Sequence, residues 1–151
     1  MDKQATTLDP YNLTRFTRAQ ESDYERALGE IRAGQKRSHW MWYVFPQVAG
    51  LGSSATSVRY AINSREEATA YLAHPVLGPR LLECAQALLR IDRRSALQIF
   101  GSPDDMKLRS SATLFASVSP ERSLFHQIID QYFEGNADIR TIELMRTAPN
   151  P

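Results

Sequence analysis

Helix-capping patterns recur along almost the whole chain, and they constrain its fold more than any other feature. Asp9-Pro10, Ser64-x-x-Glu67 and Ser102-Pro103-Asp104-Asp105 each match a helix start, with a capping side chain, a proline in the first turn or an acid that favours the helix dipole. Apolar residues then recur three, four and seven positions apart, as on one helical face. No comparable run alternates apolar and polar residues. We therefore predict an all-α fold, a single multihelical globular domain of about seven to nine helices.

The same patterns set approximate helix bounds. They predict helices from Asp9-Pro10 to about Gln20, from the capping box Ser22-x-x-Glu25 to a stop at Gly34, from Ser64 to His74-Pro75, from Val76 or Leu77 to Arg93, from Ser95 to Gly101, from Ser102-Pro103 onward, from Ser119-Pro120-Glu121 to near Gly135, and from Asp138 through Met145.

Length and composition fit one ordinary domain. The chain has 151 residues, and we expect a domain over 9–146 with flexible tails at 1–8 and 147–151. A formal net charge of +1 argues against a dedicated nucleic-acid binder. No run of 18 apolar residues predicts a membrane span, and the first residues lack an apolar signal segment, so we expect a cytoplasmic protein.

Cysteine and histidine usage gives no indication of a metal. Cys84 is the one cysteine, which excludes an internal disulfide, and its place on an apolar stripe predicts a small buried side chain. His39, His74 and His126 are far apart and lack metal-ligand spacing. We predict no metal site and no cofactor.

The densest feature is the segment Ser38–Gln47, because four of the chain's 14 aromatic residues lie between Trp40 and Phe45. These six residues could form a short buried strand or a helical turn ended by Pro46, and we favour a helix or an irregular buried segment. Aromatic residues at this density are typical of a core, above all Trp42, Val44 and Phe45.

The polar flanks of this segment also suggest a pocket, since ligand sites combine an apolar wall with a few convergent polar groups. His39 is a candidate acid or base. Trp40, Tyr43 and Gln47 are candidate ligand contacts, the rings by stacking. The alternative is that His39 is a structural residue, which is the commoner role of a lone histidine.

Two further segments could contribute to such a site. Gly52 and Ser54 lie in a glycine-serine stretch whose backbone N–H groups could approach an anion, although a plain turn with an N-cap explains it as well. On the following polar helix, Asp105, Lys107 and Ser111 could line a cleft, with Lys107 holding a phosphate or carboxylate. Close helix packing is the alternative there, and Asp104 is expected only to compensate the helix dipole.

Together, these segments resemble a known family. The resemblance is carried by Ser38–Gln47, Gly50–Ser54, Ala70–Leu81, Phe100–Ser111 and Thr113–Phe115, and extends over about residues 9 to 146. The chain is similar to small bacterial proteins classed as a domain of unknown function, some of them labelled calpastatin. The resemblance implies a multihelical bacterial protein and brings no established activity. A calpastatin label implies a disordered inhibitor, which the regular helix patterning contradicts.

Three functions remain open from the sequence. The first is a small-molecule enzyme or binder for a nucleotide, sugar phosphate or ADP-ribose-like ligand, with catalytic His39 and Asp105. The second is a non-enzymatic protein-interaction or assembly module that uses the aromatic cluster. The third, nucleic-acid binding, is disfavoured by the balanced charge.

Overall fold

The computed structural model describes residues 9–147, and helices dominate that part of the chain. Its ten helices are α2 (Thr14–Glu21), α3 (Tyr24–Arg32), α4 (Met41–Val44), α5 (Ala55–Arg59), α6 (Arg65–Ala73), α7 (Leu77–Leu89), α8 (Ala96–Phe100), α9 (Asp104–Ala116), α10 (Leu124–Phe133) and α11 (Ile139–Thr147). The predicted all-α class is confirmed. Within the described residues, the β pairing is a single parallel bridge between Val48 and Ile62.

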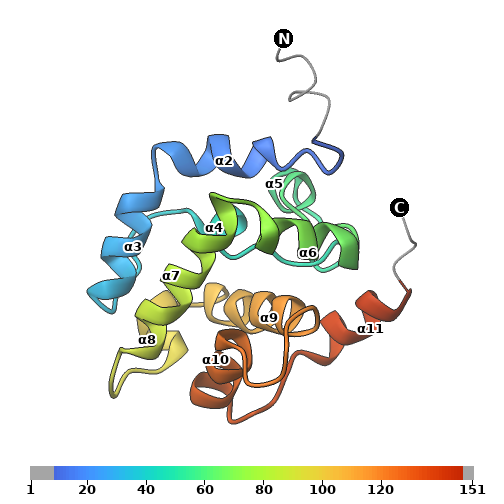
Figure 1. Ribbon diagram of the computed structural model, residues 1–151. Coiled ribbons are helices and arrows are strands. Elements are labelled where there is room, and N and C mark those ends of the chain that lie inside the picture. Colours follow the sequence, from blue (N-terminus) through green and yellow to red (C-terminus); the bar gives the residue numbers. More distant parts are fainter. Residues whose placement is uncertain (1–8, 148–151) are drawn as a thin grey trace.

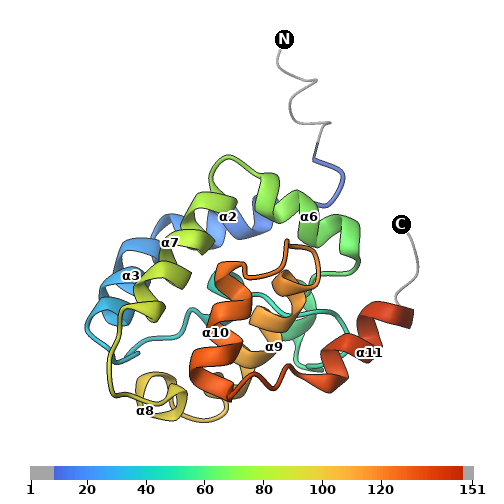
Figure 2. The same cartoon turned by 60° about the horizontal axis from the view of Figure 1, so that its bottom comes forward.

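Helix α9 forms the centre of the fold. Every residue from Ser110 to Ala116 is buried, and α9 contacts α6, α8, α10 and α11. Figure 1 shows α9 in the middle with α2 above it and α10 below. Turned by 60°, α3 and α7 lie together at one edge and α11 at the opposite edge (Figure 2). An all-round buried helix explains why α9 has little amphipathic pattern in its sequence.

Aromatic rings connect the layers of the core. Phe16 of α2 contacts Tyr71 of α6, with ring centroids 5.1 Å apart, and Tyr71 contacts Phe115 of α9 at 5.3 Å. A second cluster joins Trp40, Phe45 and Phe100, whose centroids are 6.2–6.4 Å apart. Such tilted and edge-to-face pairs contribute about 0.5–1.5 kcal/mol beyond the area they bury.

A buried ion pair fixes α2 to α6. The Arg15 guanidinium lies 2.7 Å from Glu67 Oε2, and the two side chains are 10% and 3% exposed. Arg15 also donates hydrogen bonds to four backbone carbonyls, those of Tyr11, Asn12, Arg59 and Ala61. This one side chain therefore connects the start of α2 with the end of α5 and with α6.

Several predicted caps are confirmed. Ser95 and Gln98 form a full capping box at α8, Ser64 accepts from the Glu67 N–H at α6, and Gly34 follows α3 with a φ of 74°. The segment Trp40–Phe45 contains the short helix α4, as favoured, and Val44 and Phe45 are buried.

Other predicted boundaries are wrong. Asp9 does accept from the backbone of Leu13 and Thr14, but α2 starts only at Thr14. Ser22 forms no capping box, because α3 starts at Tyr24 without a side-chain cap. Ser123 caps α10 in place of Ser119, and α9 starts at Asp104 without the predicted Ser102 cap. Helix α7 ends at Leu89 and not at the predicted Arg93. The predicted flexible tails lie outside the described residues, apart from Thr147, which ends α11.

Cys84 is expected to be chemically inert in the folded protein. The side chain is fully buried in α7, which confirms the sequence prediction, and burial raises the pKa of its thiol to about 12. Because the thiolate is the reactive form, we expect labelling by a disulfide reagent at pH 8 to be about 100-fold slower or more in native buffer than in urea. Stopped-flow absorbance measures both rates, and comparable rates would contradict the buried position.

Candidate functional site

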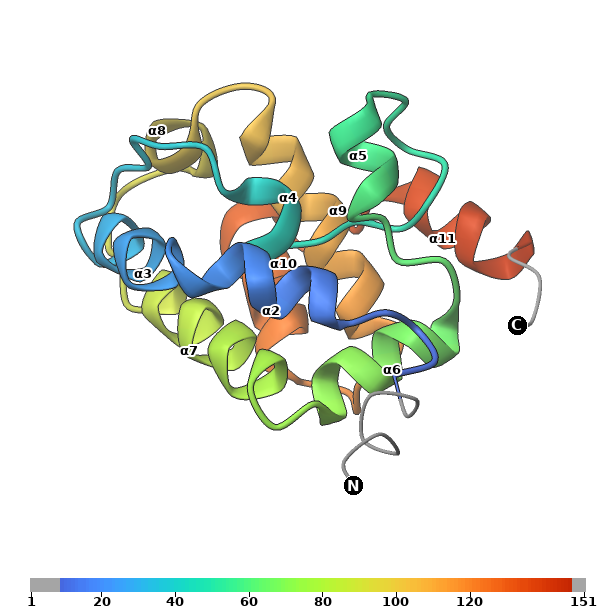
Figure 3. The same cartoon turned by 90° about the horizontal axis from the view of Figure 1, so that it is seen from above.

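The segment around α4 contacts the start of α9, so two of the regions singled out in the sequence do meet. The Lys107 ammonium lies 5.1 Å from the centre of the Trp42 ring. Lys36, which precedes the aromatic segment, pairs with Asp104 at 2.8 Å. Figure 3 shows α4 near the middle of the view, between α3 and α5.

Two lysines share one carboxylate at this junction, in a group we call the Lys36–Asp104–Lys107 cluster. Lys107 Nζ lies 3.5 Å from Asp104 Oδ1, and Lys36 Nζ also donates to the Ser38 carbonyl at 2.6 Å. The expectation that Asp104 only compensates the helix dipole is therefore wrong, because its carboxylate joins two cations. The three charges sum to +1, and the Lys107 side chain is 23% exposed while that of Lys36 is 7% exposed.

A pocket of about 250 Å³, here called the Trp42 pocket, is linked to this cluster through Trp42, although none of the three charged residues lines it. Two of its lining residues, Gln47 and Ala49, are hydrogen-bonded to the backbone of Ile62. The Ala49 N–H donates to the Ile62 carbonyl and the Ile62 N–H donates to the Gln47 carbonyl, both at 2.8 Å. The lining residues are Trp42, Gln47, Val48, Ala49, Gly50, Gly52, Ser57, Val58, Tyr60, Ala61 and Asn63. Aromatic, amide and hydroxyl groups thus face one small cavity.

The glycine-serine stretch shapes one wall of the Trp42 pocket. A Cβ on Gly52 would lie 2.6 Å from the Ser57 side chain, so this position has no room for a larger residue. Ser54 caps α5 by accepting from the Ser57 N–H at 3.1 Å. Gln47 and Gly52, both candidate ligand contacts in the sequence, line the pocket, whereas Ser54 caps α5, as in the alternative of a plain turn with an N-cap.

The remaining residues predicted to contact a ligand differ in position. Trp40 is fully buried and its indole N–H donates to Glu30, so the prediction that it stacks on a ligand is wrong. Tyr43 is half-buried, and its hydroxyl bonds to the Asp23 carboxylate and the His39 carbonyl. His39 itself is exposed and does not line the Trp42 pocket.

Two polar atoms on α9 are buried without a hydrogen-bond partner among the described residues, namely Asp105 Oδ1 and Ser111 Oγ. Ser111 is 1% exposed and lies one turn after Lys107, on the same helical face. Because an unsatisfied buried polar atom costs about 1–3 kcal/mol, such atoms call for an explanation. Neither residue lines the Trp42 pocket directly.

Glu30 is the residue that the sequence reasoning missed. Its carboxylate accepts hydrogen bonds from the Arg37 and Ser38 N–H groups at 2.8 and 3.1 Å, from Ser38 Oγ at 2.5 Å and from Trp40 Nε1 at 2.8 Å. It thereby fixes the loop that leads into α4. An acid in the last turn of a helix opposes the helix dipole, and this is the one sequence signal that could have indicated a specific partner.

These contacts predict a pH-dependent contribution to stability. Burial by itself raises the pKa of Glu30, but the hydrogen bonds from Ser38, Arg37 and Trp40 lower it overall from 4.5 to about 2. A carboxyl group whose pKa is lowered by folding contributes its full stabilisation above pH 4.5. That contribution to the free energy of unfolding is lost as the pH falls toward 2. We expect Glu30→Gln to cost about 2–3 kcal/mol at pH 7.

The measurement is urea unfolding from pH 7 down to pH 3, with Glu25→Gln on the same helix as the control because Glu25 is exposed. The difference in the free energy of unfolding between the native protein and Glu30→Gln should become smaller as the pH falls. A difference that stays constant would show that the charge of Glu30 is not responsible.

Residues 9–147 form neither a metal cluster nor a membrane span. No group of three or more His, Cys, Asp or Glu side chains there could hold a metal ion. None of the helices there has the length and apolar character required to cross a bilayer.

Comparison with known proteins gives a family but no activity. Residues 10–145 match the family model described as protein of unknown function DUF1810. The crystal structure of the conserved hypothetical protein Rv1873 from Mycobacterium tuberculosis is 50% identical, with a TM-score of 0.90 over 92% of this chain and 99% of the mycobacterial chain. No curated protein matches. The chain therefore belongs to the DUF1810 family of proteins of unknown function, as the resemblance of its motifs implied.

Proposed function

We propose that this protein binds a small anionic molecule of the nucleotide, ADP-ribose-like or sugar-phosphate class, between the His39–Gln47 segment and the Asp105–Ser111 part of α9. One observation carries the proposal: the Lys107 ammonium lies against Trp42, and Trp42 is also a wall of the Trp42 pocket. A cation and an aromatic surface are thereby available to one ligand, as recognition of a ring that bears a phosphate requires.

The charges of the cluster favour an anion. The Lys36 ammonium lies 2.8 Å from Asp104 Oδ2, whereas the Lys107 ammonium makes a longer contact of 3.5 Å with Asp104 Oδ1. A phosphate or carboxylate can therefore replace this weak contact at Lys107 without breaking the buried pair of Lys36. Gln47 supplies an amide on the pocket wall for the polar part of the ligand.

A hydrolytic reaction at this place would require a general base, and His39 and Asp105 are the two candidates. Asp105 lies two residues before Lys107, and one of its carboxylate oxygens is buried without a hydrogen-bond partner among residues 9–147. His39 is exposed in the loop that leads into α4, three residues before Trp42. We propose binding as the primary function, with turnover measured only for compounds that bind.

The test is a thermal-shift panel of nucleotides, nicotinamide dinucleotides, ADP-ribose and sugar phosphates. A ligand at 100 times its Kd stabilises by about 2.7 kcal/mol, which for a chain of this length raises the Tm by roughly 5–11 °C. Lys107→Met keeps the aliphatic stem over Trp42 and should abolish the shift. Gln47→Ala should reduce it, and Arg140→Gln, an exposed change on α11, should leave it intact.

Two results would overturn the proposal: no shift with any compound, or an equal shift in Lys107→Met.

The alternative function, an assembly module, has less exposed aromatic surface than the sequence suggested. Trp40, Val44 and Phe45 are buried, which leaves Trp42 and Tyr43 half-buried for a partner. Native mass spectrometry that shows a stable oligomer dependent on Trp42 would favour that alternative.

A further inference from the structure

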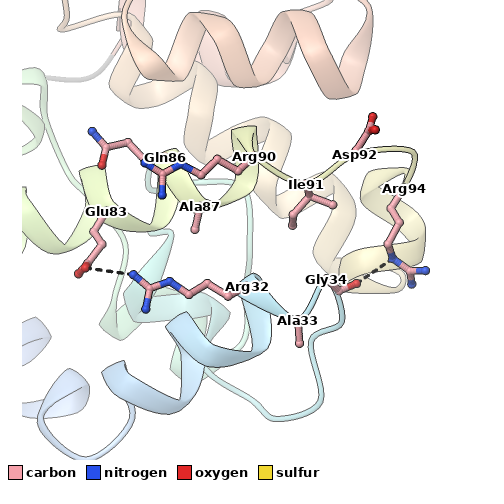
Figure 4. Close-up of a pocket in the computed structure, with 10 residues that line it drawn as sticks. All are labelled: Arg32, Ala33, Gly34, Glu83, Gln86, Ala87, Arg90, Ile91, Asp92 and Arg94. Atoms are coloured by element: carbon pink, nitrogen blue, oxygen red, sulfur yellow. Dashed lines mark hydrogen bonds and ion pairs between the residues drawn. The ribbon is translucent and has the colours of Figure 1, made fainter.

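A second cavity lies on another part of the surface, where α3 and α7 end side by side. This groove has a volume of about 600 Å³ and is here called the Arg90 groove (Figure 4). Its lining residues are Arg32, Ala33, Gly34, Glu83, Gln86, Ala87, Arg90, Ile91, Asp92 and Arg94. None of these residues lines the Trp42 pocket.

Two arginines border the groove from opposite sides. Arg32 extends from the end of α3 and Arg90 from the end of α7, and in Figure 4 both guanidinium groups point toward the end where Glu83 and Gln86 lie. Among the described residues, the Arg90 guanidinium has no ion-pair or hydrogen-bond partner. A planar cation with five donors is therefore available to a carboxylate.

The ion pair of Arg32 is easily exchanged. Arg32 lies 3.5 Å from Glu83 Oε2, and the two side chains are 60% and 46% exposed. Exposed pairs of this kind contribute little stability, typically less than about 1 kcal/mol. An incoming carboxylate can replace Glu83 at small cost, because Glu83 also bonds to the Tyr24 hydroxyl and keeps that partner.

The opposite end of the groove is held in place. Arg94 donates to the Gly34 carbonyl at 2.9 Å and to the Gln98 carbonyl at 3.1 Å, which ties the loop after α7 to the loop after α3. Apolar surface from Ala33 and Ile91 lies between the charged side chains, whereas Ala87 is buried behind it. Fixed walls reduce the ordering cost of binding.

We propose that the Arg90 groove binds an acidic peptide segment of another protein, with carboxylates at Arg90 and Arg32 and an apolar side chain against Ala33 and Ile91. The signs of the charges favour a peptide over a nucleic acid. Glu83 and Asp92 also line the groove, and they would repel a backbone that carries a negative charge at every unit. A peptide can space its carboxylates so that they meet only the arginines.

The experiment uses the full chain and a fluorescein-labelled peptide of repeated Glu-Leu-Glu-Gly units, with binding followed by fluorescence anisotropy. We expect Arg32→Gln combined with Arg90→Gln to weaken the Kd by about tenfold or more, and Arg140→Gln on the opposite edge to leave it unchanged. Amide chemical-shift changes in a titration should concentrate at residues 32–34 and 86–92. Both arginines are exposed, so the melting temperature of the double variant serves as the folding check.

Three outcomes would overturn the proposal. One is equal binding by the double variant and the native chain. Another is equal binding by a peptide in which glutamine replaces glutamate. The third is tighter binding of a short oligouridylate than of the acidic peptide, since that would assign the groove to a nucleic acid.

Discussion

Replacing Arg15 with methionine is expected to lower the free energy of unfolding by about 3–5 kcal/mol. The substitution leaves the Glu67 carboxylate, which is 3% exposed, without its cation. It also removes the hydrogen bonds from Arg15 to four backbone carbonyls. An uncompensated buried charge is one of the few causes of a mutational effect this large.

Arg18→Met is the matched control, because Arg18 is on the same helix, has the same side chain and is exposed. Urea unfolding followed by circular dichroism gives both values, and we expect Arg18→Met to cost less than about 0.5 kcal/mol. Arg15→Met combined with Glu67→Met should recover part of the loss, since it removes both charges. Equal costs for Arg15→Met and Arg18→Met would show that the pair does not stabilise the fold.

Local patterns in the sequence predicted the helices well where the cap and its partner are close along the chain. The predicted cap at Ser95 and the stop at Gly34 depend on residues within one turn, so tertiary structure has little to change. The prediction was wrong at Ser119 and Ser22, where a nearby residue starts the helix instead. Ser123 caps α10 and Asp23 stands at the N-cap of α3, and a local pattern does not decide between such neighbouring candidates.

Contacts between distant parts of the chain could not be predicted in this way. Arg15 and Glu67 are 52 positions apart, and no periodicity relates them. The pairing of Lys36 with Asp104 could not be predicted either, because the helix-start pattern alone accounts for an aspartate at position 104. Gln47 and Gly52 were candidate ligand contacts in the sequence, and both line the Trp42 pocket. The sequence also suggested that the Asp105–Ser111 helix could join the aromatic segment in one site, but not that Lys107 would lie over the Trp42 ring.

The burial of the two tryptophans shows most clearly what the sequence could not predict. They are two positions apart in an aromatic segment, and the sequence favoured Trp42 as core and Trp40 as a ligand contact. The structure reverses these positions: Trp40 is fully buried and Trp42 is half-buried at the pocket. A short irregular segment has no fixed period, so the direction of each ring depends on partners such as Glu30 and Phe100.

This difference gives the second large expected effect. Trp40→Ala should lower the free energy of unfolding by about 3–5 kcal/mol, because a fully buried indole leaves a cavity that its neighbours cannot fill. The lost contacts include the rings of Phe45 and Phe100 and the hydrogen bond to Glu30. Trp42→Ala is the matched control and should cost about 1–2 kcal/mol, since part of that ring already faces solvent.

Trp40→Phe separates the two contributions of the indole. It keeps an aromatic ring in the cluster and removes the hydrogen bond to Glu30, so its cost should depend on whether Glu30 is present. A double-mutant cycle of Trp40→Phe with Glu30→Ala, which removes the acceptor, should give a coupling energy of about 0.5–3 kcal/mol when measured by urea unfolding. Zero coupling, or a cost of Trp42→Ala equal to that of Trp40→Ala, would contradict the burial of Trp40 against Glu30. The predicted order of the two alanine variants therefore tests which tryptophan belongs to the core and which remains available to the Trp42 pocket.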